Sequence, residues 1–381
     1  MRLINTTTLE LHEYIDAPNA PGYAILSHRW GEQEVSYEEY QAGRKRDGPG
    51  YRKITDSCAF ARQHGTAWMW IDTCCIDKRS SAELSEAINS MFNWYRRACI
   101  CYAYLFDVKH PKHYPDGHSG MMRDFQNSAW FTRGWTLQEL LAPSRVWFLS
   151  EDWTYIGHKS DSSLEPTLLN AQISAITGIP EEILGQRQRI ANCSVAQRMS
   201  WAASRSTTRF EDMAYCLLGI FNINMPLLYG EGARAFERLQ AEIVGRFDDE
   251  SIFAFTPYTN DGMLALSPGR FVGAGGVEKH IFHSRPPHVL TNRGLELRIP
   301  AGDSNSPFNV SSAYRSRSDA HRILLILNCT RGTMALSAGS GVGVSGQECT
   351  PQGEYVGSIS GESGATMASS VAPAPCTTTL Q

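Results

Sequence analysis

The chain has 381 residues, of which 42% are hydrophobic and 19% are charged, and its formal net charge is −4 with an isoelectric point near 6.3. These proportions are typical of a globular protein that is long enough for more than one domain. The Lys and Arg residues are dispersed along the sequence, and the overall charge is slightly acidic. Both features argue against a nucleic-acid partner and against an acidic membrane surface.

The N-terminal segment lacks the long apolar run of a signal peptide, and no stretch approaches the ~20 apolar residues that a membrane span requires. The ten cysteines lie at uneven spacings. We therefore expect reduced thiols, a cytoplasmic location and no membrane partner.

The first part of the chain alternates short apolar runs with amphipathic segments. Apolar runs without alternation suit strands that are covered on both faces. Strands that alternate with helices imply right-handed crossovers, so the fold class is α/β, with a parallel sheet and helices on both faces. This first domain is expected over residues 1–160, with its core at 23–150. The expected strands are 23–27, 67–72, 99–106 and 146–149, and the expected helices are 51–63, 80–95 (with a Ser80/Glu83 capping box) and part of 128–143.

The pattern changes after residue 160. Two apolar stripes at helical spacing run from Phe210 to Phe221 and from Phe236 to Phe247. Short strand-like runs follow, beginning with 252–255. The expected regions are therefore a helical region (161–249), a small β-rich module (250–330) and a disordered Gly/Ser-rich tail (331–381).

Residues 128–143 contain two tryptophans, an arginine and a glutamate in a segment that is typical of a helix start. Thr132 can cap the first turn, and Pro143 ends the helix. Trp135 and Glu139 are four residues apart and therefore share a helix face. A carboxylate beside an indole can form a reactive site. The alternative is a tryptophan packed in a core beside a solvated carboxylate.

The segment Ser27-His-Arg-Trp30 follows the first expected strand, at the edge where open α/β sheets place their sites. The forked donors of Arg29 suit a phosphate or a carboxylate. The alternative is that Arg29 pairs with Asp72 or Asp77 and stacks on Trp30.

Cys75, His28 and Asp72 also follow expected strands, and they can form a thiol nucleophile, a base and an orienting group. Such triads are recognised by geometry, which spacing does not supply, so this hypothesis ranks below the others.

Four cysteines lack the loop spacing of a zinc site, because two are adjacent and two are separated by one residue. Packing of buried thiols is therefore favoured for Cys74, Cys75, Cys99 and Cys101. Residues 341–346 match a dinucleotide fingerprint by letter, but they neither follow a strand nor open a helix. We expect no metal and no resident cofactor.

Glu139 admits one further chemistry. A fixed carboxylate can act on a substrate whose leaving group departs without a proton, and nicotinamide leaving NAD is such a case. The ring leaves neutral and the ribose becomes an oxocarbenium-like cation, which a glutamate stabilises while water completes hydrolysis. NAD is the substrate of this reaction, not a cofactor.

Three long segments resemble the fungal heterokaryon incompatibility (HET) domain family, and together they span about residues 23–150. The segment 199–232 is similar to what commonly follows this domain. The resemblance implies a role in non-self recognition and regulated cell death. The three segments are Tyr23-Ala-Ile-Leu-Ser-His-Arg-Trp-Gly31, Trp70-Ile-Asp-Thr-Cys-Cys-Ile-Asp-Lys78 with the helix that follows it, and Phe131-Thr-Arg-Gly-Trp-Thr-Leu-Gln-Glu-Leu-Leu-Ala-Pro143.

The HET family in turn resembles the Toll/interleukin-1 receptor (TIR) domain, a flavodoxin-like α/β fold. In TIR domains a first strand ends in Ser-x-Arg, and a later Trp-Cys-x-x-Glu motif carries the glutamate of enzymes that hydrolyse NAD. Ser27-His-Arg29 takes the first place here, and Trp135-Thr-Leu-Gln-Glu139 takes the second, with Thr136 where TIR domains have cysteine.

The resemblance therefore implies NAD hydrolysis, with Trp135 or Trp30 stacking on a ring and Arg29 contacting phosphate. The alternative is a non-catalytic signalling module that acts by self-association or partner binding. Expected partners are NAD as substrate, a second copy of the chain, or another incompatibility or sensor protein. The catalytic residue is expected to be Glu139, and the substrate-binding residues Ser27, His28, Arg29, Trp30, Asp72 and Trp135.

Overall fold

The structure, a computed structural model, divides the chain into two compact units. One comprises Met1–Ala191 and Arg205–Gly232, and the other Asn192–Ser204 and Ala233–Gln381. The described residues are 1–14, 19–160, 167–185, 187–256 and 264–279, together with seven short strands between 289 and 380.

The first unit is an α/β domain built on a seven-stranded mixed sheet with the order β2-β1-β4-β3-β5-β6-β7. Its four central strands are parallel, as the sequence predicts, while β1, β2 and β7 pair antiparallel at the two edges. These edge strands were not predicted from the sequence. The sheet is therefore mixed, whereas a parallel sheet was predicted. The strands are β1 (Arg2–Asn5), β2 (Leu11–Glu13), β3 (Ala24–His28), β4 (Trp68–Trp70), β5 (Ile100–Tyr104), β6 (Val146–Leu149) and β7 (Tyr155–Lys159).

The parallel strands stand in the order second, first, third, fourth along the chain. This is the order in which a flavodoxin-like sheet begins, and its ligand crevice opens where the connections diverge, at the carboxyl ends of the first and third strands. Here these strands are β3 and β5, which pair in register from Ala24 with Ile100 to His28 with Tyr104. The topology therefore places Ser27 and His28 at the switch point.

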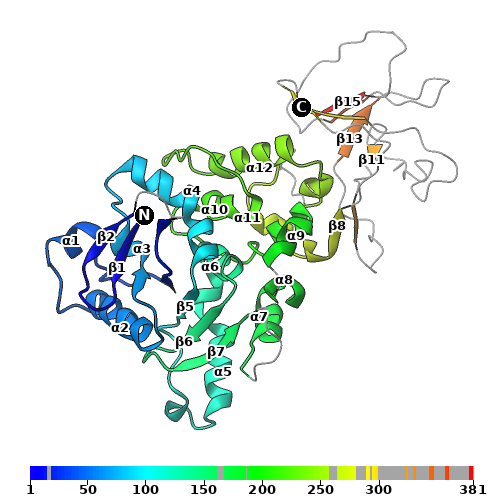
Figure 1. Cartoon of the computed structure of the whole chain (residues 1–381). Coiled ribbons are helices and arrows are strands. Elements are labelled where there is room, and N and C mark those ends of the chain that lie inside the picture. Colours follow the sequence, from blue (N-terminus) through cyan, green and yellow to red (C-terminus); the bar gives the residue numbers. More distant parts are fainter. Residues whose placement is uncertain are drawn as a thin grey trace. The chain divides into compact units, whose positions relative to one another are not determined.

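Helices cover both faces of this sheet (Figure 1). On one face, Phe60 of α2 packs edge-on against Tyr102, with ring centroids 5.1 Å apart. On the other face, Tyr95 of α4 donates to Leu26 O at 2.9 Å, and Trp130 packs 5.5 Å from Phe148. Because successive strand side chains point to opposite faces, the two layers bury alternate residues of each strand.

The remaining elements of the first unit are mostly short. Its longest helix begins as predicted, since Ser80 accepts from Glu83 N at 3.2 Å. The reciprocal half of the predicted capping box is absent, because the Glu83 carboxylate bonds Asp77 N and Arg2 instead. The helical elements are α1 (Tyr37–Gln41), α2 (Pro49–Gln63), α3 (Asp72–Cys75), α4 (Ser81–Arg97), η2 (Pro111–His113), α5 (His118–Asn127), η3 (Ala129–Thr132), α6 (Thr136–Leu141), α7 (Asn170–Thr177), α8 (Glu181–Gly185), α10 (Asp212–Tyr215) and α11 (Leu218–Phe221), with η4 (Arg187–Asn192) at the boundary of the units.

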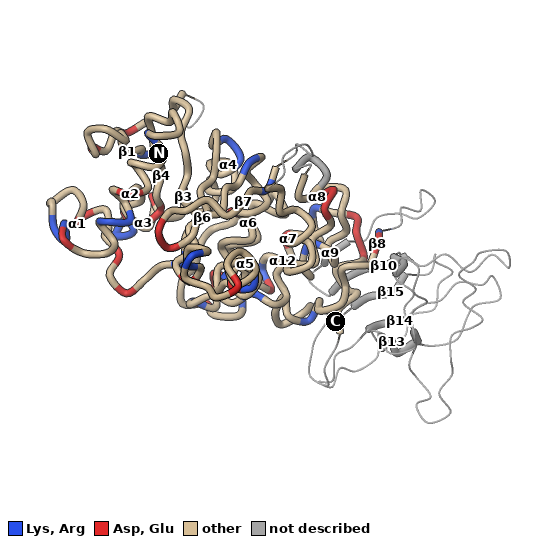
Figure 2. The backbone as a smooth tube through the Cα atoms, turned by 90° about the horizontal axis from the view of Figure 1, so that it is seen from below, with Lys and Arg blue, Asp and Glu red and all other residues tan. Residues whose placement is uncertain are grey.

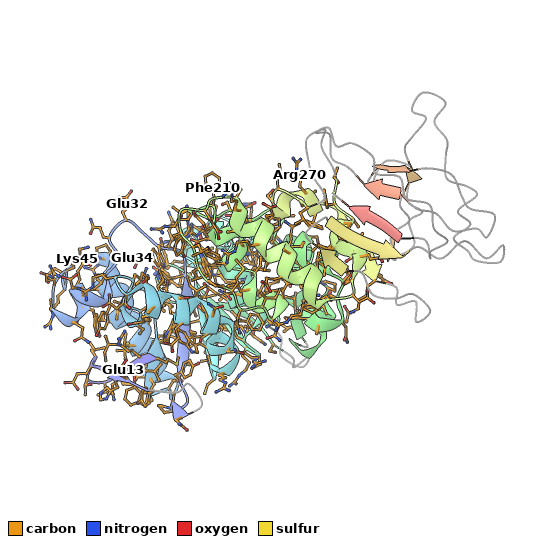
Figure 3. The ribbon with its side chains drawn as sticks, turned by 90° about the horizontal axis from the view of Figure 1, so that it is seen from above. Glu13, Glu32, Glu34, Lys45, Phe210 and Arg270 are labelled. Carbon is orange, nitrogen blue, oxygen red and sulfur yellow. The ribbon has the colours of Figure 1, made fainter. Side chains whose placement is uncertain are left out.

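The first predicted apolar stripe forms two short helices, α10 and α11, and its first member is not buried. Phe210 is 80% exposed and lies at the surface (Figure 3). Phe210 lies two residues before α10 and outside the helix, so the helical period imposes no packing partner on it. Phe221, at the other end of the stripe, is fully buried.

The second unit contains the other predicted stripe, whose residues Phe236, Leu239 and Ile243 are buried along α12. The strand predicted at 252–255 is wrong, because this segment forms the 3-10 helix η5. Asp249 caps that turn by accepting from Ser251 N at 3.1 Å. The helical elements are α9 (Val195–Ser200), α12 (Arg234–Arg246), η5 (Glu250–Phe253), η6 (Pro268–Phe271) and η7 (Ala274–Gly276).

The described strands of the second unit form a six-stranded sheet, β11-β13-β14-β15-β10-β9, and a two-stranded sheet, β12-β8. Within the range predicted to be a disordered tail, strand backbone is described at β13, β14 and β15, and most other residues lie outside the described ones. The predicted boundaries at 160, 249 and 330 stay predictions. The strands are β8 (Val277–Lys279), β9 (Val289–Thr291), β10 (Gly294–Arg298), β11 (Ile323–Leu324), β12 (Cys329–Arg331), β13 (Gly343–Gly346), β14 (Gly357–Ile359) and β15 (Thr377–Leu380).

In the described ranges, no helix has both the length and the apolar composition needed to cross a membrane.

Candidate functional site

Four side chains from four elements meet at the carboxyl end of β3, and we call Ser27, Tyr95, Trp130 and Glu139 the Ser27 cluster. Trp130 Nε1 donates to Ser27 Oγ at 2.8 Å, and the Ser27 hydroxyl donates to Glu139 Oε2 at 2.5 Å. The Tyr95 hydroxyl also contacts the Glu139 carboxyl. All four residues are buried, so these bonds form away from bulk water.

Burial controls the protonation of Glu139. It raises the pKa of this carboxyl from 4.5 to about 8, and the nearby Asp72 charge adds to the rise. The bond from Ser27, the Arg133 charge and the contact with Tyr95 act in the opposite direction but do not cancel it. Glu139 is therefore largely protonated at neutral pH and poised to ionise just above it.

Glu139 lies on α6, a helix that begins later than the sequence predicts. Trp135 occupies the N-cap position, and no side chain caps the helix there. Thr132 is not the cap, because its hydroxyl donates to Ala129 O at 2.9 Å within the preceding 3-10 turn. Thr136 instead joins the two segments by donating to Trp130 O at 2.6 Å. This bond ties the helix of Glu139 to the turn that carries Trp130.

The indole beside Glu139 is Trp130, and the predicted partner Trp135 turns elsewhere. Trp135 is half-buried, and its side chain hydrogen bonds to Asp212. Asp212 also accepts from Tyr229 at 2.9 Å. The spacing of four residues predicted that Trp135 and Glu139 share a helix face, but the Trp135 side chain bonds Asp212 instead of joining the Ser27 cluster.

A second group of side chains lies at the same strand end, and we call His28, Glu34, Lys53 and Asp72 the His28 cluster. His28 Nε2 is 3.8 Å from Glu34 Oε2, and its Nδ1 is 3.9 Å from Asp72 Oδ1. Lys53 of α2 binds Glu34 Oε1 at 2.5 Å. Strand alternation directs His28 toward α2 and Ser27 toward α6, so these neighbours in sequence belong to different clusters on opposite faces of the sheet.

Burial lowers the pKa of His28 below its ordinary value, and the Lys53 charge adds to this, in spite of the two carboxylates. Burial alone would raise the pKa of Glu34, but bonds and charges from His28 and Lys53 outweigh it and lower that pKa to about 2. At neutral pH the cluster therefore contains a neutral imidazole beside an ionised Glu34–Lys53 pair.

Trp30 extends the His28 cluster to the surface. Its Nε1 donates to Asp72 Oδ2 at 2.8 Å, and the Lys78 ammonium lies 3.6 Å from the centre of its ring. Trp30 is 46% exposed. A cavity of about 200 Å³ opens here, with Trp30, Glu34, Thr73, Asp77, Lys78 and Arg79 among its lining residues.

Arg29 takes no part in either cluster. It is exposed, and its guanidinium carbon lies 5.9 Å from the ring centre of Phe106. The predicted alternative, pairing with Asp72 or Asp77 and stacking on Trp30, is wrong. Arg79 binds Asp77, and Lys78 stacks on Trp30. Arg29 therefore keeps its donors toward solvent, where a ligand can reach them.

Charges of both signs are interspersed around α1 (Figure 2). Arg44 pairs there with Glu38, and Lys45 pairs with Glu39. Of the residues that Figure 3 labels near α1, Glu34 belongs to the His28 cluster, and Lys45 is the partner of Glu39. The mixture matches the dispersed Lys and Arg of the sequence.

Neither ring nitrogen of His28 is hydrogen bonded to Cys75, so the thiol and the imidazole of the hypothetical triad are not joined. Cys75 accepts a hydrogen bond from Ile71 N at 3.4 Å and is 3% exposed. Cys74 and Cys101 are fully buried, as predicted for packed thiols, whereas Cys99 is exposed. The described residues contain no group of three or more His, Cys, Asp or Glu that could hold a metal ion.

Two members of the Ser27 cluster were missed from the sequence. Tyr95 was only the last residue of the helix predicted at 80–95, and Trp130 was only one of the two tryptophans in the stretch around Glu139. The signal for both was β3 itself, because an isolated Ser27 in a buried strand requires hydrogen-bond partners from the covering layer.

Residues 23–116 match the model of a family described as heterokaryon incompatibility protein (HET). Vegetative incompatibility protein HET-E-1 of Podospora anserina is 47% identical over 239 residues, which cover 61% of this chain and 17% of that protein. No solved structure matches the chain, so the TIR-like part of the resemblance stays a prediction. Ser27, His28 and Asp72 lie within the matched range, and Glu139 lies beyond it. Over residues 23–116 the chain is therefore similar to the heterokaryon incompatibility (HET) domain family.

Proposed function

We propose that the chain acts in fungal heterokaryon incompatibility, in non-self recognition that leads to regulated cell death, and that it does so by hydrolysing NAD. The HET domain and the similarity to an incompatibility protein support the biological role. The observation that carries the chemistry is the hydrogen bond that Ser27 donates to the buried Glu139 carboxyl at the switch point of the sheet.

Glu139 is the catalytic residue of this proposal. The bond between ribose C1′ and the nicotinamide nitrogen breaks, and its electron pair leaves with the neutral ring. The ionised Glu139 stabilises the resulting ribosyl cation, while Ser27 fixes the carboxylate and exposed Arg29 and Trp30 contact phosphate and ring. Water then adds to C1′ and releases a proton, which gives nicotinamide and ADP-ribose.

The protonation state of Glu139 predicts the pH dependence of this reaction. The carboxylate is the active form, and its pKa of about 8 leaves it mostly protonated at pH 7. The value of kcat/KM reports the ionisation of the free enzyme, so it is expected to rise through about pH 8 and then to level off.

The test incubates the purified full chain with NAD and follows nicotinamide release. Glu139→Gln keeps the size of the side chain but removes the negative charge, so the rate should fall by about 100-fold or more. Glu86→Gln is the matched control, because Glu86 is an exposed carboxylate of α4. Release that survives Glu139→Gln would move the reaction to another site.

One observation favours the alternative, a non-catalytic module that acts by self-association or partner binding. Glu139 is buried, and it lines neither the cavity beside Trp30 nor the one beside Lys45. A folded chain that releases no nicotinamide at any pH from 6 to 9, but sediments as an oligomer, would support that function.

A further inference from the structure

The helix that carries Glu139 depends on contacts with other elements for its position. With only six residues, α6 has little stability of its own, because short helices in water are marginal. The Lys159 ammonium binds the last turn of α6 at Leu140 O (3.0 Å) and the chain just beyond the helix at Pro143 O (2.6 Å). Its beginning has no side-chain cap, so contacts from elsewhere in the unit must define where the helix starts.

Those contacts come from a segment more than sixty residues further along the chain. Ser206 N donates to Thr132 O at 2.7 Å, and Gly134 N donates to Ser206 O at 2.8 Å. Together these bonds form a parallel bridge between Arg133 and Ser206. The approach is close, since a Cβ on Gly134 would lie 2.5 Å from the Thr207 side chain.

Arg205 stands at the start of this segment and is buried, at 5% exposure. One of its terminal nitrogens donates both to Arg133 O and to Thr136 Oγ1, each at 3.0 Å. Its charge also interacts with the Glu139 carboxyl. Burying a guanidinium costs several kcal/mol unless its surroundings compensate, so a buried arginine at this place has a specific function in the fold.

We propose that Arg205 is a positioning residue of the proposed site, which fixes the start of α6 and holds Glu139 against Ser27. The segment Arg205–Gly232 then completes the HET site from outside the residues that match the family model. This inference rests on the proposed function for its catalytic meaning, but the placement of Glu139 is testable without any turnover.

The measurement uses the ionisation of Glu139. The free energy of unfolding of the wild type and of Glu139→Gln is measured by urea denaturation from pH 5 to 10. Their difference changes with pH and levels off where Glu139 ionises in the folded protein. The pH of this bend is the midpoint of the Glu139 titration in the folded protein. The groups that face the Glu139 carboxyl and affect its ionisation are Ser27, Asp72, Tyr95, Cys101, Arg133, Arg205 and Cys216.

Repeating the pair of measurements with Arg205→Met in both proteins tests the proposal. Loss of a nearby positive charge disfavours the carboxylate, so the midpoint should move upward from about 8 by about one pH unit. Arg205→Lys keeps the charge and should leave the midpoint near its wild-type position. Arg198→Met, which removes a buried arginine of the other unit, controls for the loss of a buried cation and should leave the midpoint unchanged.

A purely structural arginine would lower stability equally at every pH and would not move the midpoint, and this result would overturn the proposal. If Arg205→Met does not fold, Arg205→Gln, which keeps an N–H donor but removes the charge, decides the question by an upward shift or by none. A shifted midpoint without nicotinamide release would reject NAD hydrolysis but support the positioning role of Arg205. Nicotinamide release that depends on Glu139, together with an unshifted midpoint, would support NAD hydrolysis but reject the positioning role.

Discussion

The Ser27 cluster and the His28 cluster include adjacent residues of β3, yet the pKa of the buried carboxyl in each cluster is shifted in opposite directions. Burial raises the pKa of Glu139 to about 8, because Ser27, Tyr95 and Arg133 compensate only part of the lost hydration. Glu34 is also partly buried, but its pKa falls to about 2, because Lys53 and His28 lie against it. Burial alone therefore does not set the charge of an acidic side chain. A cation bonded directly to the carboxyl, as Lys53 is to Glu34, offsets the effect of burial.

The two clusters should therefore lose their contributions to the stability of the fold at opposite ends of the pH scale. Glu139 has a folded-state pKa above its unfolded value, so its contribution to stability is complete below about pH 4.5 and is lost as the pH rises through about 8. Glu34 has a folded-state pKa below its unfolded value, so its contribution is present above about pH 4.5 and is lost as the pH falls toward 2. His28 adds to the loss in acid, because burial lowers its pKa.

The largest effect is expected for Glu139→Gln. The amide cannot ionise, so the variant should gain stability relative to the wild type as the pH rises from 4.5 to 8, by up to about 5 kcal/mol at ~1.4 kcal/mol per pH unit. Urea denaturation at pH 5, 7 and 9 measures this difference. A difference that stays constant over the three values would mean that Glu139 has an ordinary pKa, and the contrast between the clusters would disappear.

A smaller effect is expected for Lys53→Met, which leaves Glu34 beside a neutral imidazole. The Lys53 and Glu34 side chains are 11% and 15% exposed, so breaking their pair at pH 7 should cost about 2 kcal/mol, reduced from the full value for buried pairs by the remaining access of water. Arg44→Met breaks an exposed pair with Glu38 and is the control, with little change expected. Equal effects of the two substitutions would show that Glu34 does not depend on Lys53.

The smallest effect is expected for Trp130→Phe, which keeps most of the ring but removes the donor to Ser27 Oγ. The loss should be about 1 kcal/mol. A double-mutant cycle with Ser27→Ala isolates this bond, and the two losses should not add. Additive losses would mean that the indole only fills space in the core, as the alternative interpretation of this stretch holds.

Much of the fold follows from local sequence patterns. The four parallel strands, α2, α4 and the buried stripe of α12 occur close to their predicted positions, because each depends on a hydrophobic period that its own residues specify. The prediction was wrong where a tertiary partner decided the local structure. The residues at 252–255 form a 3-10 turn capped by Asp249, and Thr132 does not cap α6, which starts four residues later.

The candidate site shows the same division. The sequence by itself determined that Ser27, His28 and Asp72 stand at strand ends and that Glu139 is the carboxyl to test. Only the tertiary structure decided that Ser27 and His28 face opposite sides of the sheet, that Trp130 and not Trp135 accompanies Glu139, and that Arg205 reaches α6 from a distant segment. The reason is that strand and helix periods describe contacts within an element, whereas hydrogen bonds between elements depend on how the layers pack.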